Sequence, residues 1–141
     1  MTIVYREHIE TISPAQLEGF FDGWPNPPSP ETHLRLLRES DAVVLAWDEE
    51  KDCMVGFITA ITDHVLSAYI PLLEVLPAYR GRGIGREMVR RMLEQLEGLY
   101  MVDLLCDTDL QPFYETLGMR RATGMMVRRY ERQSGKPLEG L

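Results

Sequence analysis

The stretch Tyr79-Arg80-Gly81-Arg82-Gly83-Ile84-Gly85-Arg86 decides how the rest of the sequence is interpreted. An apolar run at residues 69–76 precedes it and stops at Pro77, and a helical pattern with one apolar face follows it as far as Leu96. A glycine loop between a strand and a helix can bind pyrophosphate, because glycine lets the backbone approach the anion and the first helical turn has unpaired N–H groups. Arginine side chains add positive charge at the same point. The stretch therefore predicts an anion-binding loop.

The spacing of the glycines indicates which kind of loop this is. A Walker A loop requires a lysine, which is absent here, and a dinucleotide-binding loop requires Gly-x-Gly-x-x-Gly, whereas Gly81, Gly83 and Gly85 alternate strictly. From Arg80 to Gly85 the stretch matches Arg/Gln-x-x-Gly-x-Gly/Ala. This pattern resembles the acetyl-CoA motif of the GNAT superfamily of N-acetyltransferases. For this motif alone, the alternative is a surface turn rich in glycine and arginine.

A second motif strengthens the resemblance. Residues 110–119, LQPFYETLGM, are similar to the xxFYxxLGF helix of the same family, with Met119 at the last aromatic position. The resemblance implies an α/β, GNAT-type acyl-CoA N-acyltransferase fold, with a mixed central sheet of six or seven strands and about four helices. It covers residues 1–130 as a single domain, and residues 131–141 are expected to form a polar, frayed tail.

The local patterns place the elements in the order β-α-α-β-β-β-α-β-α-β. The predicted strands are 3–6, 42–47, 53–62, 69–76, 100–106 and 119–130, the last being one strand or a pair divided at Gly124. The predicted helices are 14–21, 30–38, 84–98 and 110–117. The first two helices each begin with Ser-Pro, a capping residue followed by proline at the first helical position.

The composition is that of an ordinary globular protein, with 141 residues, 45% hydrophobic and 26% charged. No apolar run approaches a membrane span and the N-terminus lacks the apolar core of a signal peptide, so we expect a cytoplasmic protein without membrane contact. The net charge of −7 argues against a nucleic-acid binder. Residues 1–76 carry 4 Lys/Arg against 13 Asp/Glu, and residues 77–141 carry 11 against 9. This asymmetry favours an anionic cofactor at the second half and a cationic acceptor at the first.

The two cysteines, Cys53 and Cys106, have no Cys-x-x-Cys spacing. We therefore expect buried thiols, with neither a disulfide nor a metal site. Because no cysteine adjoins the glycine loop or the second motif in sequence, a cysteine acyl-enzyme has little support.

The resemblance implies acetyl-CoA as the co-substrate. Its pantetheine arm would bond the backbone of the central strand where that strand separates from its neighbour, and its pyrophosphate would bond the N–H groups of the glycine loop. Asp107 falls near a position where many members carry asparagine, which makes its contact with the cofactor less secure. The residues expected to contact the cofactor are Leu73, Glu74, Val75, Arg80, Gly81, Arg82, Gly83, Ile84, Gly85, Arg86, Asp107 and Tyr114.

Two residues are expected to carry the chemistry. Tyr114 is the candidate general acid, because a phenol titrates near 10 and can give its proton to a leaving thiolate. It could instead pack against the cofactor and donate a hydrogen bond to its sulfur. Glu74 is the candidate general base, acting directly or through water, because it is the only carboxylate on the predicted strand 69–76. Alternatively its side chain points to the other face and pairs with an arginine.

The remaining candidates line or flank the acceptor cleft. The secondary base candidates are Asp63 and His64, while His33 and Glu31 are expected to line the acceptor cleft. The candidate walls of the acceptor pocket are Phe20, Phe21, Trp24 and Tyr69. We expect an N-acetyltransferase acting by direct attack of a primary amine, either a small molecule or a peptide, with a homodimer left open. The alternatives are a non-catalytic acyl-CoA-binding sensor of the same fold and a nucleotide binder, which the missing Walker lysine disfavours.

Overall fold

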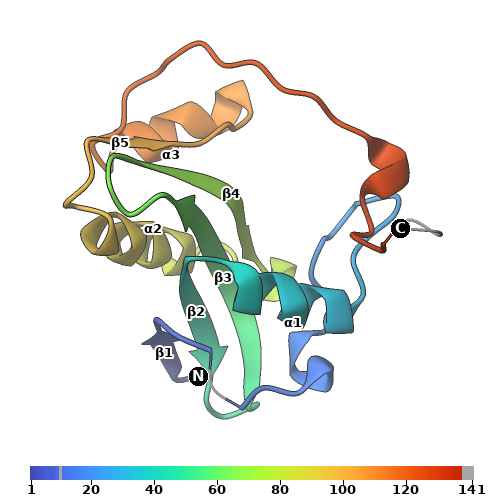
Figure 1. Cartoon of the computed structure of the whole chain (residues 1–141). Helices are drawn as coiled ribbons and strands as arrows, with labels where there is room; N and C mark the ends of the chain where they lie inside the picture. Colours follow the sequence, from blue (N-terminus) through green and yellow to red (C-terminus); the bar gives the residue numbers. More distant parts are fainter. Residues whose placement is uncertain (10, 138–141) are drawn as a thin grey trace.

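The computed structural model describes residues 1–9 and 11–137. Its helices and strands are β1 (Ile3–Arg6), the 3-10 helix η1 (Pro14–Leu17), α1 (Pro30–Glu39), β2 (Ala42–Asp48), β3 (Cys53–Thr62), β4 (Ser67–Val75), η2 (Pro77–Tyr79), α2 (Ile84–Gln95), β5 (Met101–Asp103), η3 (Thr108–Leu110), α3 (Gln111–Glu115) and η4 (Tyr130–Arg132). The strands form one mixed sheet in the order β1-β2-β3-β4-β5 (Figure 1). The pairs from β1 to β4 are antiparallel, and β5 joins β4 in parallel.

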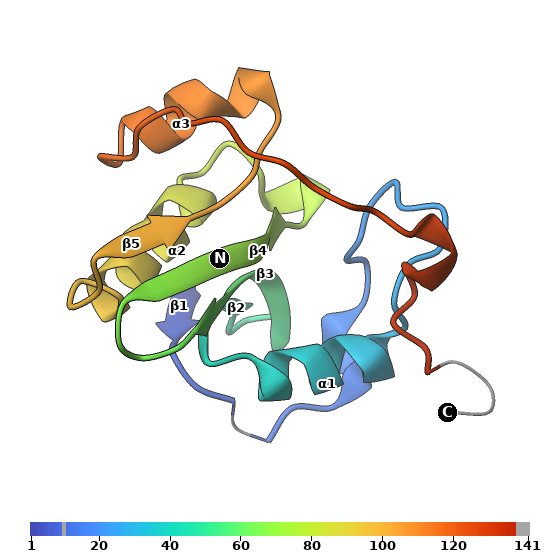
Figure 2. The same cartoon turned by 45° about the horizontal axis from the view of Figure 1, so that its top comes forward.

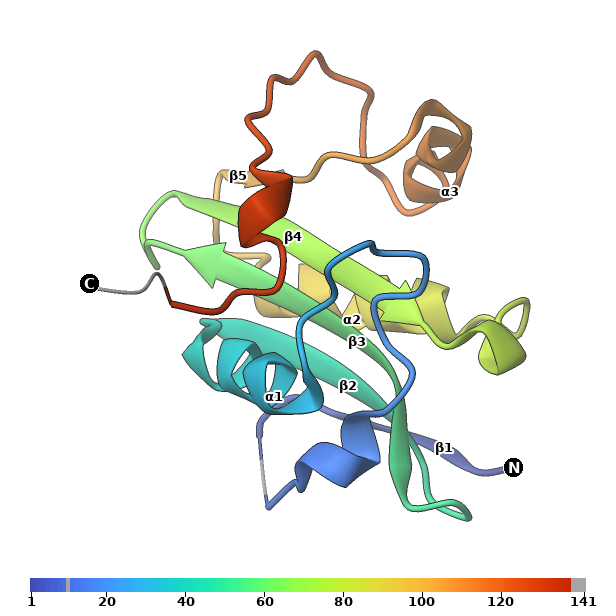
Figure 3. The same ribbon diagram turned by 90° about the vertical axis from the view of Figure 1, so that its right-hand side faces the viewer.

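Helices cover both faces of the sheet, with α1 on the near side and α2 on the far side in Figure 3. The alternation of side chains in β2 supplies both cores. Val44 and Ala46 pack with the apolar face of α2, while Val43, Leu45 and Trp47 pack with α1 and η1. Two buried layers thus hold the centre of the sheet rigid, which is what a site at its edge requires.

The central strand β4 carries a bulge. Thr59 of β3 pairs with Leu72 and Ile61 pairs with Tyr69, so Ile70 and Pro71 together stand opposite one residue of β3. An extra residue in a strand shifts its alternation of faces, and proline is tolerated there because it has no N–H group to pair. The bulge lies where β4 loses its other neighbour, as described below.

The number of elements differs from the sequence-based expectation. Within the described residues there are five strands rather than six or seven and three α-helices rather than four. The first predicted helix is only the short 3-10 helix η1, because the backbone then turns left-handed at Gly19 (φ 90°) and Phe21 (φ 63°). The predicted strand 100–106 is reduced to the three residues of β5, which are partly exposed rather than buried.

The predicted strand 119–130 is wrong. Residues 119–129 are irregular, and the chain runs from α3 to η4 without joining the sheet (Figure 2). Residues 131–137 of the expected frayed tail are partly ordered, since the backbone N–H of Asn26 donates to Gln133 Oε1 at 2.9 Å. The end of the predicted tail, residues 138–141, lies outside the described residues. In the part of the chain that is described, no helix combines the length and apolarity needed to span a membrane.

Candidate active site

The candidate site begins where β4 and β5 separate. The two strands pair only over Ser67–Met101, Ala68–Val102 and Tyr69–Asp103. Beyond Tyr69, within the described residues, β4 has a strand partner only on the β3 side. The backbone of residues 70–75 is therefore available on the β5 side to bond an extended ligand. These residues include Leu73, Glu74 and Val75, which were expected from the sequence to contact the cofactor.

The glycine loop follows β4 and leads directly into α2. Gly81 and Gly83 have left-handed backbones (φ 78° and 82°), which residues with side chains rarely adopt. Apart from the adjacent residues of the chain, no atom of the described residues lies within 4 Å of where a Cβ would stand on either glycine. The first α-helical bond runs from Glu87 N to Gly83 O at 3.1 Å. The N–H groups of Ile84, Gly85 and Arg86 therefore have no intrahelical acceptor, and Gly83 has no side chain to cap them. The start of α2 can thus donate several hydrogen bonds to an anion.

A buried hydrogen bond anchors the loop to the sheet. The hydroxyl of Tyr79 donates to Asp48 Oδ2 at 2.6 Å. This bond lowers the pKa of Asp48 and, with burial, raises the pKa of Tyr79 to about 12. Sequence reasoning missed this pair. In the sequence Tyr79 is only the first residue of the loop stretch, and no pattern there connects it with Asp48.

The loop arginines are engaged with the protein. Arg80 Nε donates to the carbonyl of Val75 at 2.9 Å, which fixes the end of β4. Arg82 lies over the ring of Tyr79, 5.6 Å from its centroid. Arg86 Nη1 donates to Thr116 Oγ1 at 2.7 Å and so connects α2 with the end of α3. These three arginines place positive charge around the start of α2, and their contacts stabilise the conformation of the glycine loop.

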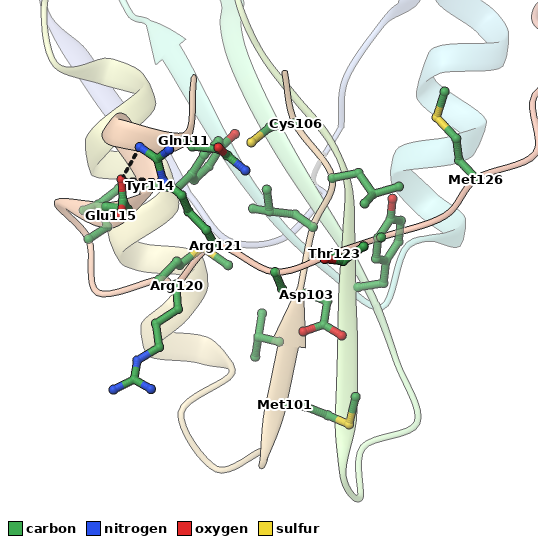
Figure 4. Close-up of a pocket in the computed structure, with 18 of the residues that line it drawn as sticks. Met101, Asp103, Cys106, Gln111, Tyr114, Glu115, Arg120, Arg121, Thr123 and Met126 are labelled. Carbon is green, nitrogen blue, oxygen red and sulfur yellow. Dashed lines mark hydrogen bonds and ion pairs between the residues drawn. The ribbon is translucent and has the colours of Figure 1, made fainter. Parts of the chain in front are cut away.

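Tyr114 projects from α3 into a cavity of about 1380 Å³ between β5, α3 and residues 119–128. Figure 4 shows Tyr114 and Gln111 near Cys106 at one end of this cavity, with Met101 and Asp103 at the other. Burial, and then the neighbouring Cys106, raises the pKa of Tyr114 to about 12. Cys106 also lines the cavity, so the expectation that no cysteine adjoins the second motif is wrong in three dimensions. Burial, together with Asp107 and Asp109, raises the pKa of the Cys106 thiol.

Glu74 is held by the backbone of the loop between η1 and α1. Its Oε1 accepts from Phe21 N at 2.8 Å and its Oε2 accepts from Asp22 N at 3.2 Å. The left-handed conformation of Phe21 aims successive N–H groups at one anion, as in an anion-binding nest. The carboxylate therefore faces the segment expected to border the acceptor, and backbone groups rather than an arginine bind it.

Comparison with known proteins agrees with this geometry. The model of the acetyltransferase (GNAT) family matches residues 9–119. The chain belongs to the acetyltransferase (GNAT) family. It is 49% identical to a Deinococcus radiodurans R1 protein assigned as an acetyltransferase, whose crystal structure superposes with a TM-score of 0.92 over 96% of this chain and 94% of that one. It is 25% identical over 122 residues to the uncharacterized N-acetyltransferase ycf52 of Pyropia yezoensis, covering 82% of this chain and 69% of that protein.

A more distant structure shares the GNAT fold. The complex of AAC(6')-Iy with the bisubstrate analogue CoA-S-monomethyl-acetylneamine superposes with a TM-score of 0.67 at 16% identity, over 92% of this chain and 98% of that one. At this identity the likeness concerns the fold alone.

The secondary base candidates Asp63 and His64, and the expected cleft residue Glu31, lie outside the cavity that contains Tyr114. Asp63 accepts from the N–H groups of Leu66, Val65 and Ser67, which hold its pKa well below its usual range. His64 is exposed, 3.6 Å from Asp41, and Glu31 is exposed in the first turn of α1. In the described residues, no group of three or more His, Cys, Asp or Glu side chains could hold a metal ion.

His33 is a buried residue of the second core. Its ring is 4.4 Å from Phe57 and 4.8 Å from Phe21, centroid to centroid, and neither ring nitrogen has a hydrogen-bond partner among the described residues. Burial lowers its pKa to about 4. Sequence analysis placed His33 at the acceptor cleft, whereas in the structure its ring packs against the ring of Phe21 in the core.

The expected acceptor walls fall into two groups. Phe20 and Phe21 are buried in the core with His33, and the ring of Trp24 lies 4.8 Å from that of Phe21, centroid to centroid, with the residue 36% exposed. Tyr69 is apart from this group and lines the cavity that contains Tyr114. Asp107 is exposed in front of η3 and does not line that cavity.

Proposed function

We propose that this chain is an acetyl-CoA-dependent N-acetyltransferase that moves an acetyl group to a primary amine by direct attack. One observation carries the proposal. The unpaired side of β4 leads straight to the free N–H groups at the start of α2, and Tyr114 lines the cavity on the β5 side. A long ligand with an anionic middle and a reactive end fits this sequence of contacts. Residues 1–130 would form the catalytic domain.

The residues present fit coenzyme A. The start of α2 offers N–H donors, and the open space at Gly81 and Gly83 lets a diphosphate reach them. The backbone of residues 73–75 would bond the pantetheine amides. Acetyl-CoA, when bound, supplies an activated acetyl thioester. The fold of this chain is also that of AAC(6')-Iy, which was solved with a CoA-containing bisubstrate analogue.

Tyr114 would protonate the sulfur as the carbon–sulfur bond breaks. Its raised pKa of about 12 keeps the hydroxyl protonated at neutral pH, so the donor form is always present. A thiol titrates near 8.5, which makes full transfer from this phenol uphill by about 5 kcal/mol. The group therefore contributes most through a short hydrogen bond to the developing thiolate, and the proton is finally replaced from solvent.

Glu74 would receive the proton that the amine loses as its nitrogen attacks the thioester carbon. Its two oxygens each accept one backbone bond and keep a further lone-pair site. The amine or an intervening water can therefore bind it without breaking its support. The same two bonds would also position Phe21 and Asp22, so Glu74 combines proton transfer with shaping of the acceptor loop.

Direct attack is favoured over an acyl-enzyme on Cys106. Although this thiol lines the cavity, burial and two neighbouring aspartates raise its pKa. A thiol is a nucleophile only as the thiolate, which this environment disfavours. The acidic residues 1–76, with 13 Asp/Glu, favour a cationic amine as the acceptor.

The test is a screen of primary amines with acetyl-CoA, in which release of the free thiol is followed. The panel should contain polyamines, amino sugars, amino acids and peptide N-termini. We expect turnover with at least one class, and a loss of kcat without loss of CoA binding in Tyr114→Phe. Tight binding of acetyl-CoA with no turnover for any amine would overturn the enzyme and favour the non-catalytic acyl-CoA sensor.

A further inference from the structure

The helix that carries Tyr114 cannot fix its own position. α3 has five residues, far below the length at which a helix is stable alone, and none of its residues is fully buried. Phe113, Tyr114 and, just after the helix, Leu117 are only partly buried where they pack against the core that α2 covers. In Figures 1 and 3, α3 lies at the rim of the molecule. The position of Tyr114 therefore depends on the contacts that α3 makes with other elements.

One hydrogen bond joins the end of α3 to the start of α2. Thr116, the residue that caps the end of α3, accepts at Oγ1 from Arg86 Nη1 at 2.7 Å, and its hydroxyl donates to the carbonyl of Phe113 at 2.6 Å. Glu115 bonds to Arg121 instead. Among the described residues, no other side-chain hydrogen bond joins α3 or Thr116 to the sheet or to α2.

The backbone around Tyr114 depends on the same residue. Leu117 N and Met119 N both donate to the carbonyl of Tyr114, at 3.0 and 3.2 Å. Thr116 N donates to the carbonyl of Pro112 at 3.2 Å. Because Thr116 lies between these bonds, a shift of its side chain would move the backbone on both sides of Tyr114.

Arg86 lies where the proposed diphosphate site and α3 meet. It is in the first turn of α2, where N–H groups without an intrahelical acceptor converge. Its side chain is exposed, and within the described residues only its Nη1 has a hydrogen-bond acceptor. The other N–H groups of the guanidinium can therefore bind a phosphate while Nη1 keeps its bond to Thr116.

We propose that Thr116 is a positioning residue for Tyr114, and that Arg86 links it to the diphosphate of the cofactor. This inference rests on the proposed function. With the diphosphate bound, Arg86 holds the Thr116 hydroxyl, and the end of α3 holds Tyr114 in place. Binding energy from an unreactive part of a substrate can organise the reacting end in this way, so that a truncated substrate loses kcat and not only affinity.

Hydrogen exchange tests the link without relying on turnover. The probes are CoA and pantetheine, which has the same thiol end but no diphosphate, each at saturation. We expect CoA to slow exchange at residues 84–86 and also, by about tenfold, at residues 116–119, whereas pantetheine should leave 116–119 unchanged. In Thr116→Val, CoA should still slow exchange at 84–86 but no longer at 116–119. The comparison of the two probes uses wild type alone, so it decides the link even if a variant does not fold.

Steady-state kinetics test the consequence for catalysis. Thr116→Val should lower kcat with acetyl-CoA by about tenfold at an unchanged Kd for CoA, and should change kcat with S-acetylpantetheine by less than about twofold. Thr116→Ser keeps the hydroxyl and should keep the wild-type kcat. In a Tyr114→Phe background, Thr116→Val should have no further effect, because a positioning residue acts through the residue that it places.

Thr62→Val is the matched control. The Thr62 hydroxyl also donates to a carbonyl, that of Ser67 at 2.7 Å, and accepts from the N–H of His64 at 3.0 Å. Thr62 lies in a turn outside the cavity that contains Tyr114. The two variants thus remove the same group and the same number of hydrogen bonds, and Thr62→Val should behave as wild type in both experiments.

Three results would refute the link. Equal slowing at residues 116–119 by CoA and by pantetheine would show that the diphosphate plays no part. An equal loss of kcat with both donors in Thr116→Val, or a similar loss in Thr62→Val, would show a general structural effect. Slow exchange at 84–86 with no change at 116–119 would refute the link and leave the proposed cofactor site standing. No change at 84–86 would refute the cofactor site itself, and the link with it.

Discussion

Replacing His33 with phenylalanine should remove a large part of the acid sensitivity of the fold. His33 is buried among Phe20, Phe21 and Phe57, and in the part of the chain that the structure describes neither ring nitrogen has a hydrogen-bond partner. Its pKa falls from 6.5 to about 4, because burial disfavours the charged ring. Between these two pKa values the unfolded chain therefore binds a proton at His33 that the folded chain does not bind. The part of the folding stability that depends on neutral His33 is present above pH 6.5 and is lost as the pH falls from 6.5 towards 4.

The two pKa values fix the size of the effect. With 6.5 in the unfolded chain and about 4 in the folded one, the loss at pH 5 is about 2 kcal/mol relative to pH 7.5. The pKa of Glu87 is lowered from its ordinary value of 4.5 to about 2, mainly by its hydrogen bond with Arg90, so Glu87 changes the stability little until the pH falls below 4.5. Measurement at pH 5 therefore isolates the histidine.

Urea unfolding at pH 7.5 and pH 5 measures the loss. Wild type should lose about 2 kcal/mol more than His33→Phe between these two values. Any cost of fitting the larger ring is present at both pH values and cancels in the comparison. His64→Asn is the control, because His64 is an exposed histidine with a left-handed backbone that asparagine tolerates. If His33→Phe keeps the acid sensitivity of wild type, the argument from the unpartnered imidazole is wrong.

Three further predictions concern the site. Tyr114→Phe should lower kcat by roughly 10²-fold or more while the Kd for CoA is unchanged, as steady-state kinetics and calorimetry will show; an unchanged kcat removes the tyrosine from the chemistry. Glu74→Gln should lower kcat by roughly 10²-fold, whereas Asp22→Asn, a matched change at an exposed neighbour, should not; equal losses would mean that charge on this loop matters and not proton transfer. Tyr79→Phe should lower the free energy of unfolding by about 1–3 kcal/mol, because it removes the donor to buried Asp48; urea unfolding that matches wild type would contradict the anchoring of the loop.

The locally determined parts of this fold could be predicted from sequence. The strand at 53–62 has the predicted bounds, and α2 begins at Ile84 as the loop motif indicated. Alternating apolar residues and a glycine before a helix fix their own conformation through neighbours in sequence. The predicted membership of the GNAT family was confirmed. It could be predicted because the glycine loop and the second motif are each short and contiguous in sequence.

The parts set by distant contacts could not be predicted. The helix expected at 14–21 stops early because Glu74, 53 residues from Phe21, binds the turned backbone. Residues 119–129 have the sequence pattern of a strand. A strand must pair with the edge of a sheet, however, and the sequence does not show where that edge lies. Cys106 and Tyr114 are eight positions apart and meet only because the chain turns back at η3.

Calorimetric titration with acetyl-CoA tests the central claim most directly, namely that the start of α2 and the glycine loop bind the diphosphate of coenzyme A. The comparison is wild type against Gly83→Glu, which adds a negative charge and a side chain at a left-handed position where the N–H groups converge. We expect wild type to bind and the variant to bind at least about tenfold more weakly, while its unfolding curve shows that it remains folded. Equal affinity in a folded variant would contradict the account.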